Sequence, residues 1–217
     1  MKRILSGPTL ALALALASPS ALAAPSPSGP TPDQVRTLLS GYEKVPSADD
    51  WARLGPPEAV SAELVRIASG ARADAHALLA ARATSSLAHF PLPSVRAFLE
   101  ARVRDTSARP QLRGKAAIAL ARAFGDAAAP AIASLFAAGD ADLREDAIRA
   151  YRQLVSPAAE RFVLARAARE PLPRLAGLMR EAGQAIASER QQRKNDRRLD
   201  PTLESTPDIA DPGPVAR

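Results

Sequence analysis

The side chains that could perform catalysis or hold a metal ion are few in this chain. Its 217 residues include no Cys, which removes thiol nucleophiles, zinc–thiolate sites and thiol redox chemistry, and they include two His. His76 and His89 are expected on one helix, 13 residues and therefore about 20 Å apart, so they cannot share a metal ion. Neither is followed by the Glu of a helical H-E-x-x-H motif. We therefore expect no catalytic residue, metal site, cofactor or small-molecule substrate.

The acidic residues are better explained by helix capping than by chemistry. The stretch from Asp140 to Asp146 lacks the D-x-D-x-D-G spacing and the closing Glu of a calcium-binding loop. We expect Asp140 to cap a helix in a variant of the capping box, and Asp49 and Asp50 to do the same before Trp51. No G-x-S-x-G motif, phosphate-binding P-loop or G-x-G-x-x-G fingerprint is present in the sequence.

Arginine is the residue type with the strongest claim to a binding role. One group runs from Arg96 to Arg113, a second from Arg161 to Arg174, and the densest basic run covers 190–198. Two interpretations remain open. These groups form ordinary solvated faces, with Arg near helix C-termini and the last run extending the final helix, or they meet an anionic partner.

The elements that carry these residues are predicted from apolar spacing. Three apolar residues spaced four apart, as on one face of a helix, recur after 37 residues and then twice after 31 residues. A period between 20 and 50 residues is typical of an α-solenoid. The recurring positions are Leu79, Ala83 and Leu87; Ala116, Leu120 and Phe124; Ala147, Tyr151 and Val155; and Leu178, Ala182 and Ile186. Ala is the best helix former and is poor in strands, so its abundance predicts an all-α protein.

Proline, glycine and small polar residues mark the expected helix boundaries. Helices are predicted to begin at Thr31–Asp33, Ser94, Pro110, Ser156 and Pro173, and a turn is predicted around 47–51. Further helices are expected at about 57–69, 73–90 and 141–155, with a short one around Ile132.

Two segments resemble HEAT repeats, in the short form called PBS-lyase HEAT-like repeats. Residues 111–120 and 142–151 carry the pattern x-Leu-Arg-x-x-Ala, and the likeness covers about 73–187. Pro91 and Pro171 depart from it, and the last repeat reverses the order as Arg174–Leu175. The resemblance implies a short right-handed α-solenoid of about four antiparallel helix pairs. HEAT-like enzymes that bind iron use paired His–Glu motifs, which this sequence does not contain.

The resemblance also suggests which surface would hold a partner. In HEAT-like solenoids the second helix of each pair lines the concave face. On that basis the candidate partner-binding residues are Arg96, Glu100, Arg104, Arg161 and Arg166. Trp51, the single Trp, would either anchor a partner or close the open end of the repeat stack.

The N-terminus has the three parts of a secretory signal peptide: Lys2 and Arg3, an apolar run, and Ala21–Leu22–Ala23 as the cleavage site. The alternative, an uncleaved membrane anchor, is disfavoured because the run falls short of the ~20 residues that span a bilayer. We predict a signal peptide at 1–23, a Pro/Ser linker at 24–32, the solenoid at 33–190 and a disordered tail, first basic and then acidic and Pro-rich, at 191–217.

Together these features predict a bacterial protein that is exported to the periplasm or secreted. It would be a monomeric, non-catalytic scaffold that binds another protein. The first alternative, based on the arginine groups and the basic run at 190–198, is an electrostatic binder of lipopolysaccharide, phospholipid headgroups or nucleic acid. The net charge of +6 falls to a mild +4 after cleavage. An enzyme subunit is the second alternative.

Overall fold

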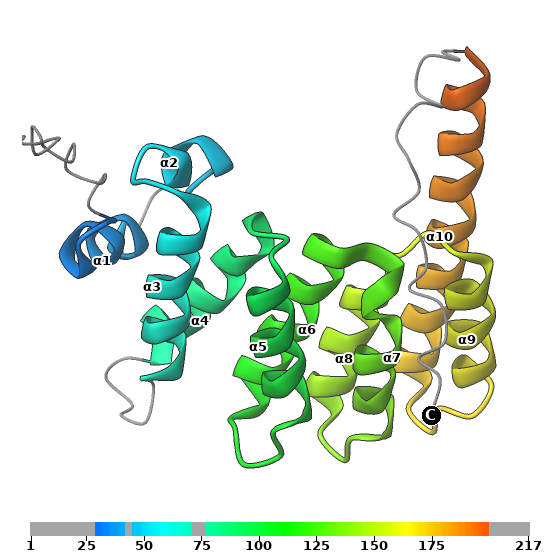
Figure 1. Ribbon diagram of the computed structural model, residues 1–217. Coiled ribbons are helices and arrows are strands. Elements are labelled where there is room, and N and C mark those ends of the chain that lie inside the picture. Colours follow the sequence, from blue (N-terminus) through cyan, green and yellow to red (C-terminus); the bar gives the residue numbers. More distant parts are fainter. Residues whose placement is uncertain (1–28, 42–44, 71–76, 200–217) are drawn as a thin grey trace, which may run out of the picture.

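The computed structural model describes residues 29–41, 45–70 and 77–199, and every regular element within these ranges is a helix (Figure 1). The predicted all-α class is thereby confirmed. The predicted signal peptide, most of the linker and the segment after residue 199 lie outside the described residues.

Three helices form the N-terminal end: α1 (Pro32–Ser40), α2 (Ala48–Ala52) and α3 (Pro57–Ser69). Ser47 and Asp50 form a capping box, in which each side chain accepts a hydrogen bond from the backbone N–H of the other residue. The same arrangement joins Thr31 and Gln34 at the start of α1. The segment predicted as a turn around 47–51 is therefore a short helix, because its box satisfies N–H groups that a turn would leave to water.

Four helices form a continuous row in which each contacts the next: α4 (Ala77–Ser86), α6 (Pro110–Phe124), α8 (Ala141–Tyr151) and α10 (Pro173–Leu199) (Figure 1). The twelve apolar positions predicted to recur lie on these helices or in the residues directly after them, and none is exposed. Eight of the twelve are buried: Ala83, Leu87, Ala116, Leu120, Ala147, Tyr151, Ala182 and Ile186. The four-residue spacing therefore marks the face of the row that packs inward.

A second set of helices packs against this row. It comprises α5 (Pro93–Arg104), α7 (Ala129–Ala133) and α9 (Pro157–Ala167), which contact α6, α8 and α10 respectively, as α3 contacts α4. Short 3₁₀ turns complete the chain at η2 (Leu87–His89), η3 (Gly125–Ala128) and η4 (Ser134–Ala137). Figure 1 shows α5, α7 and α9 following one another along the same side of the row.

The predicted helix caps are confirmed in part. Asp140 accepts a hydrogen bond from the Leu143 N–H at 3.0 Å, but Leu143 itself occupies the third helical position, so no reciprocal box forms. Ser156 caps α9 by accepting from the Ala159 N–H. The predicted cap at Ser94 is wrong: Pro93 begins α5, because proline's fixed φ and missing N–H suit the first helical position.

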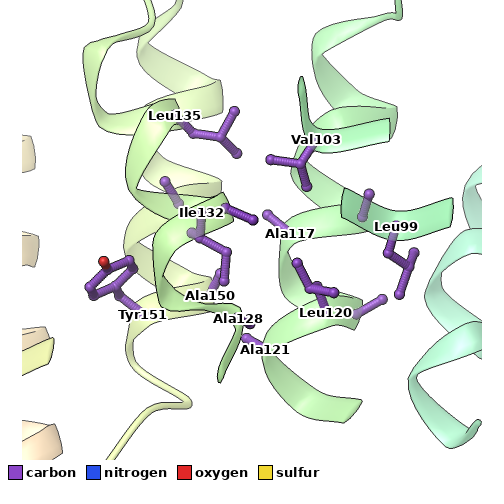
Figure 2. Packing of buried hydrophobic residues seen from close by; sticks show 14 of the residues in the cluster. Leu99, Val103, Ala117, Leu120, Ala121, Ala128, Ile132, Leu135, Ala150 and Tyr151 are labelled. Carbon is purple, nitrogen blue, oxygen red and sulfur yellow. The ribbon is translucent and has the colours of Figure 1, made fainter. Parts of the chain in front are cut away.

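The core lies where the two sets of helices meet. Figure 2 shows apolar side chains of α5, α6, α7 and η4 pointing into one layer, among them Leu99, Leu120, Ile132 and Leu135, all with no exposed surface. Alanines line the same layer and let the helix axes approach closely. Burial of each large aliphatic side chain is worth about 2 kcal/mol.

An aromatic cluster joins the second set of helices to α8. Phe136, Tyr151 and Phe162 have ring centroids 5.0–5.4 Å apart. The Tyr151 hydroxyl donates to the Ala129 carbonyl at 3.2 Å, and burial raises its pKa to about 12. The phenol therefore stays neutral and acts as a hydrogen-bond donor within the core.

The stretch Pro110–Ala137 is, among the described residues, long and apolar enough to cross a membrane by length and composition. Gly125 interrupts it with a φ of +54°. The helix before this break, α6, has 15 residues and is about 22 Å long, which is less than the ~30 Å hydrocarbon core of a bilayer. Its apolar face packs in the core, and we assign the stretch to the protein interior.

The C-terminal helix, α10, has 27 residues and continues to Leu199, which agrees with the interpretation of the basic run 190–198 as an extension of the final helix. The domain boundary predicted at 190, with a disordered tail from 191, is wrong for residues 191–199. Arg190 reaches back to Glu160 of α9 at 2.7 Å, and Arg193 pairs with Glu189 one turn before it. No Pro or Gly interrupts the helix in this stretch, and these pairs support its continuation.

Candidate functional site

Three of the predicted partner-binding residues form a ladder along α5. Arg96 Nε and Arg104 Nη2 each donate to one carboxylate oxygen of Glu100, both at 2.9 Å. The hydrogen bond from Arg96 is the main cause of a lowered pKa at Glu100. Arg96 also lies over the Phe124 ring, 5.9 Å from its centroid. The ladder therefore carries two positive charges and one negative charge, held in a fixed geometry.

The other two predicted residues lie on α9 and differ from each other. Arg161 is exposed and forms no hydrogen bond or ion pair with any described residue. Arg166 is half-buried and donates to the Phe136 carbonyl at the end of η4, while its Nε atom is buried without a partner among the described residues. The five candidate partner-binding residues thus do not form one cluster, because α7 lies between α5 and α9 (Figure 1) and Arg166 bonds within the fold.

Arg166 belongs to a set of arginines that bond to the C-terminal ends of other helices. Arg102 donates to the Ala68 carbonyl at the end of α3, at 3.4 Å, and Arg113 donates to the Val103 carbonyl at the end of α5, at 3.1 Å. Arg144 donates to the carbonyls of Ala138 and Gly139 after η4, at 2.7 and 3.1 Å. These carbonyls lie in the last turn of a helix or directly after it, where C=O groups lack an intrahelical partner, so the arginines satisfy them and link successive helices.

This set explains the Leu-Arg pattern of the sequence. Arg113 and Arg144 occupy the same position in the two segments with the strongest repeat pattern, and both donate to the end of the preceding helix. Arg174, in the segment with the reversed order, instead pairs with Glu145 of α8. The arginine at this repeat position has a structural role.

The remaining sequence candidates are the two histidines, the acidic residues and Trp51. His76 lies outside the described residues, and His89 is exposed at the end of η2. Within 29–41, 45–70 and 77–199, no three His, Asp or Glu side chains lie close enough together to hold a metal ion. Trp51 is buried, and its ring meets that of Phe90 edge to face, with the ring centroids 6.5 Å apart. It therefore packs in the fold and is not an exposed anchor.

A groove that the sequence did not reveal lies between α1, α4 and α6. It encloses about 490 Å³ and is open to solvent. Its apolar lining includes Leu39 of α1, Val45 and Pro46 after α1, and Leu78 of α4. Val45 and Leu78 are 81% and 64% exposed, the highest values among the large apolar side chains described. We call this hollow the α4–α6 groove.

Among the described residues that line the α4–α6 groove, the charged ones are the cations Arg82 of α4 and Lys115 and Arg122 of α6. His89 of η2 adds an imidazole, and none of these described lining residues is a carboxylate. Arg122 forms no hydrogen bond or ion pair with any described residue. The positive charge of Lys115 favours the ionised form of the half-buried Asp146, although burial has the larger effect and raises the pKa of that carboxyl. Arg82 donates to the Gly41 carbonyl. The groove thus combines apolar surface with positive charge, and its Arg82 and Arg122 form no ion pair with any described residue.

The α4 side of the groove follows a helical stripe that was present in the sequence. Leu78, Arg82, Ser85 and His89 recur at spacings of three and four residues and so share one face. That stripe alone did not mark a site, because α1 and α6 complete the hollow.

A second, smaller cavity of about 320 Å³ adjoins the groove at His89, and Trp51 and Phe90 also line it. The Trp51 Nε1 atom is buried without a partner among the described residues.

Comparison with protein-family models finds no match, and searches of curated proteins and of solved structures find no significant match.

Proposed function

We propose that this chain is a non-catalytic binding protein that folds as a short, right-handed, HEAT-like α-solenoid. One observation carries the proposal: α4, α6, α8 and α10 contact one another in order, and each has a helix of the second set packed against it. The recurring inward positions and the equivalent roles of Arg113 and Arg144 support it. Such a stack presents a long, regular surface suited to holding a macromolecule.

The partner we propose is another protein, and the setting is the periplasm or the exterior of a bacterial cell. The sequence of residues 1–23 supports export. The solvent-accessible part of the predicted partner surface consists of the exposed Arg104 and Arg161 and the half-buried Arg96 and Glu100, a mixture of both charges. Mixed charges at fixed positions favour selective recognition of a complementary protein surface over adsorption to any anion.

The test uses residues 24–217 as bait for the exported fraction of the source cells, with quantitative mass spectrometry. We expect specific partners to be retained and to be lost with Arg96→Glu/Arg161→Glu. The matched control, Arg152→Glu, reverses an exposed charge in the residue that follows α8 and should retain them. Equal recovery on the parent, the double variant and a Leu120→Asp bait would contradict the proposal, because folded structure would then be irrelevant to capture.

A second candidate, binding of anionic surfaces, is favoured by the C-terminal part of α10. Lys194 and Arg198 are exposed there, and they form no hydrogen bond or ion pair with any described residue. Titration of the chain with phosphatidylglycerol vesicles at increasing salt distinguishes the candidates. A steep loss of affinity that Lys194→Glu/Arg198→Glu abolishes supports this function, and an affinity independent of salt excludes it.

A further inference from the structure

The α4–α6 groove combines exposed apolar side chains with cationic ones. It brings the two most exposed large apolar side chains of the described residues next to three cationic ones and the imidazole of His89. We propose that this groove binds an acidic polypeptide segment of a partner protein, one that carries apolar side chains between its carboxylates. This inference rests on the proposed binding function and names the chemistry of the partner.

Two exposed apolar side chains line the same hollow. Val45 follows α1 and Leu78 lies on α4, and both are largely open to water. Isolated apolar residues on a surface are common, but two that line the same groove form a patch that a partner's side chain can cover. The volume of about 490 Å³ falls in the range of sites that receive a few side chains.

The cationic side chains of the groove have few opposite charges nearby. In the ladder on α5, Glu100 already neutralises one of the two arginines. In the groove, Arg82 and Arg122 form no ion pair with any described residue, and Lys115 has the partly buried Asp146 as its nearby opposite charge. An incoming carboxylate therefore finds donors in the groove that need not exchange an existing ion pair.

The spacing of the cations favours a polypeptide over a single headgroup. Lys115 and Arg122 are seven residues apart on α6, which places them about 10 Å apart along the helix axis. Arg82 lies on the neighbouring helix α4. The three cationic side chains thus place donors on two helices, and several carboxylates can engage them at once. Carboxylates distributed along a chain can reach them, with apolar residues between them on Leu78 and Val45.

The experiment selects peptides from a random 16-residue display library on the immobilised chain 24–217, and then measures binding of one labelled peptide by fluorescence anisotropy. We expect the selected peptides to be enriched in Asp and Glu together with Leu, Ile or Phe. Binding should weaken about tenfold in Arg122→Glu and in Leu78→Ser, and it should weaken further as salt is added.

Matched controls reverse or remove the same groups elsewhere. Arg180→Glu changes an exposed arginine of α10, and Leu172→Ser changes a leucine that is 42% exposed; neither residue lines the groove. Both should bind the peptide within about twofold of the parent. All four changes are at exposed positions, so thermal melts monitored by circular dichroism should coincide and exclude unfolding as the cause.

Several outcomes would overturn the inference. One is a set of selected peptides without acidic enrichment, and another is an affinity that Arg122→Glu and Leu78→Ser leave unchanged. A third is binding that appears only after residues 200–217 are removed, because the chain's own C-terminus would then be the occupant. Phosphatidylglycerol vesicles whose binding both variants abolish would identify a lipid as the ligand instead. If captured proteins are lost with Arg96→Glu/Arg161→Glu but retained by the groove variants, the proposed function stands and the groove assignment alone fails.

Discussion

Arg144 and Glu170 form an ion pair that is almost closed to water. Arg144 Nη2 lies 3.1 Å from Glu170 Oε1, and the two side chains are 11% and 2% exposed. The same guanidinium donates to the carbonyls of Ala138 and Gly139. One side chain of α8 thus joins the end of η4 to the segment that precedes α10.

Replacing Glu170 by Gln should destabilise the protein by about 3 kcal/mol, because the buried guanidinium of Arg144 would lose its counter-charge. Urea denaturation at pH 7 measures this loss. Glu189→Gln, which breaks the exposed pair with Arg193, should cost less than about 0.5 kcal/mol. Equal losses in the two variants would show that the pair between Arg144 and Glu170 is as weak as one at the surface.

Gly114→Ala should destabilise the fold although alanine favours helices. A Cβ atom at Gly114 would lie 2.0 Å from the Asp146 carboxylate and 2.8 Å from the Asp146 Cβ, so α6 and α8 would have to move apart. We expect a loss of about 1–3 kcal/mol. Gly177 of α10 has open space at the same place, and Gly177→Ala should stabilise by about 0.5–1 kcal/mol. Thermal melts of both variants give the comparison, and a gain at both positions would contradict the close approach of α6 and α8.

Asp146→Asn should stabilise the protein at neutral pH. Burial raises the pKa of this carboxyl, against the opposing charges of Lys115 and Arg149 and with a smaller contribution from Glu145. The native state therefore binds the proton more tightly than the unfolded state, so this group lowers stability as the pH rises through its folded pKa. The advantage of the amide should disappear below about pH 4, where both states are protonated.

The control for this prediction is Asp142→Asn, at an exposed position in the first turn of α8. It should lose about 0.3–1 kcal/mol at pH 7, because the helix N-terminus favours a negative charge. The free energy of unfolding, measured for each variant at several pH values, separates the two effects. A constant difference between Asp146→Asn and the parent from pH 3 to pH 7 would show that burial does not shift this pKa.

Leu120→Asp should unfold the helical array. Leu120 has no exposed surface, and an aspartate there would place a charge between α6 and the helices on both sides of it. The expected loss exceeds about 4 kcal/mol. Leu172→Asp, at a position that is 42% exposed, should melt close to the parent. A cooperative melt of Leu120→Asp at the parent temperature, followed by circular dichroism, would show that the assigned inward face is wrong.

The helices with strong local signals could be predicted from the sequence. The bounds of α3 and α6 match the prediction because each begins with Pro at its first helical position and stops at a Gly, Gly70 and Gly125. Local signals failed where two of them competed. Ser94 is a good capping residue, but Pro93 before it suits the first helical position better. At Ser47, the reciprocal bonds with Asp50 favoured a short helix over a turn.

The candidate site could not be predicted to the same extent, because it depends on tertiary structure. The α4–α6 groove exists because α1 and the residues after it approach α4 and α6, which begin more than 30 residues later in the chain. The hydrogen bond of Arg166 also depends on tertiary structure, because its acceptor, the Phe136 carbonyl, lies 30 residues earlier in the chain. A one-dimensional pattern shows which arginines cluster, but it does not show which of them bond inside the fold.

The arginines that end on backbone carbonyls have a consequence for how this sequence can change over time. Every residue type presents the same carbonyl oxygen, so Arg113 and Arg144 keep their acceptors whatever side chains occupy the ends of the helices they reach. Those ends are therefore free to diverge or to exchange with one another, while the donors stay under selection. A family of such chains would drift apart in sequence and still retain this scaffold.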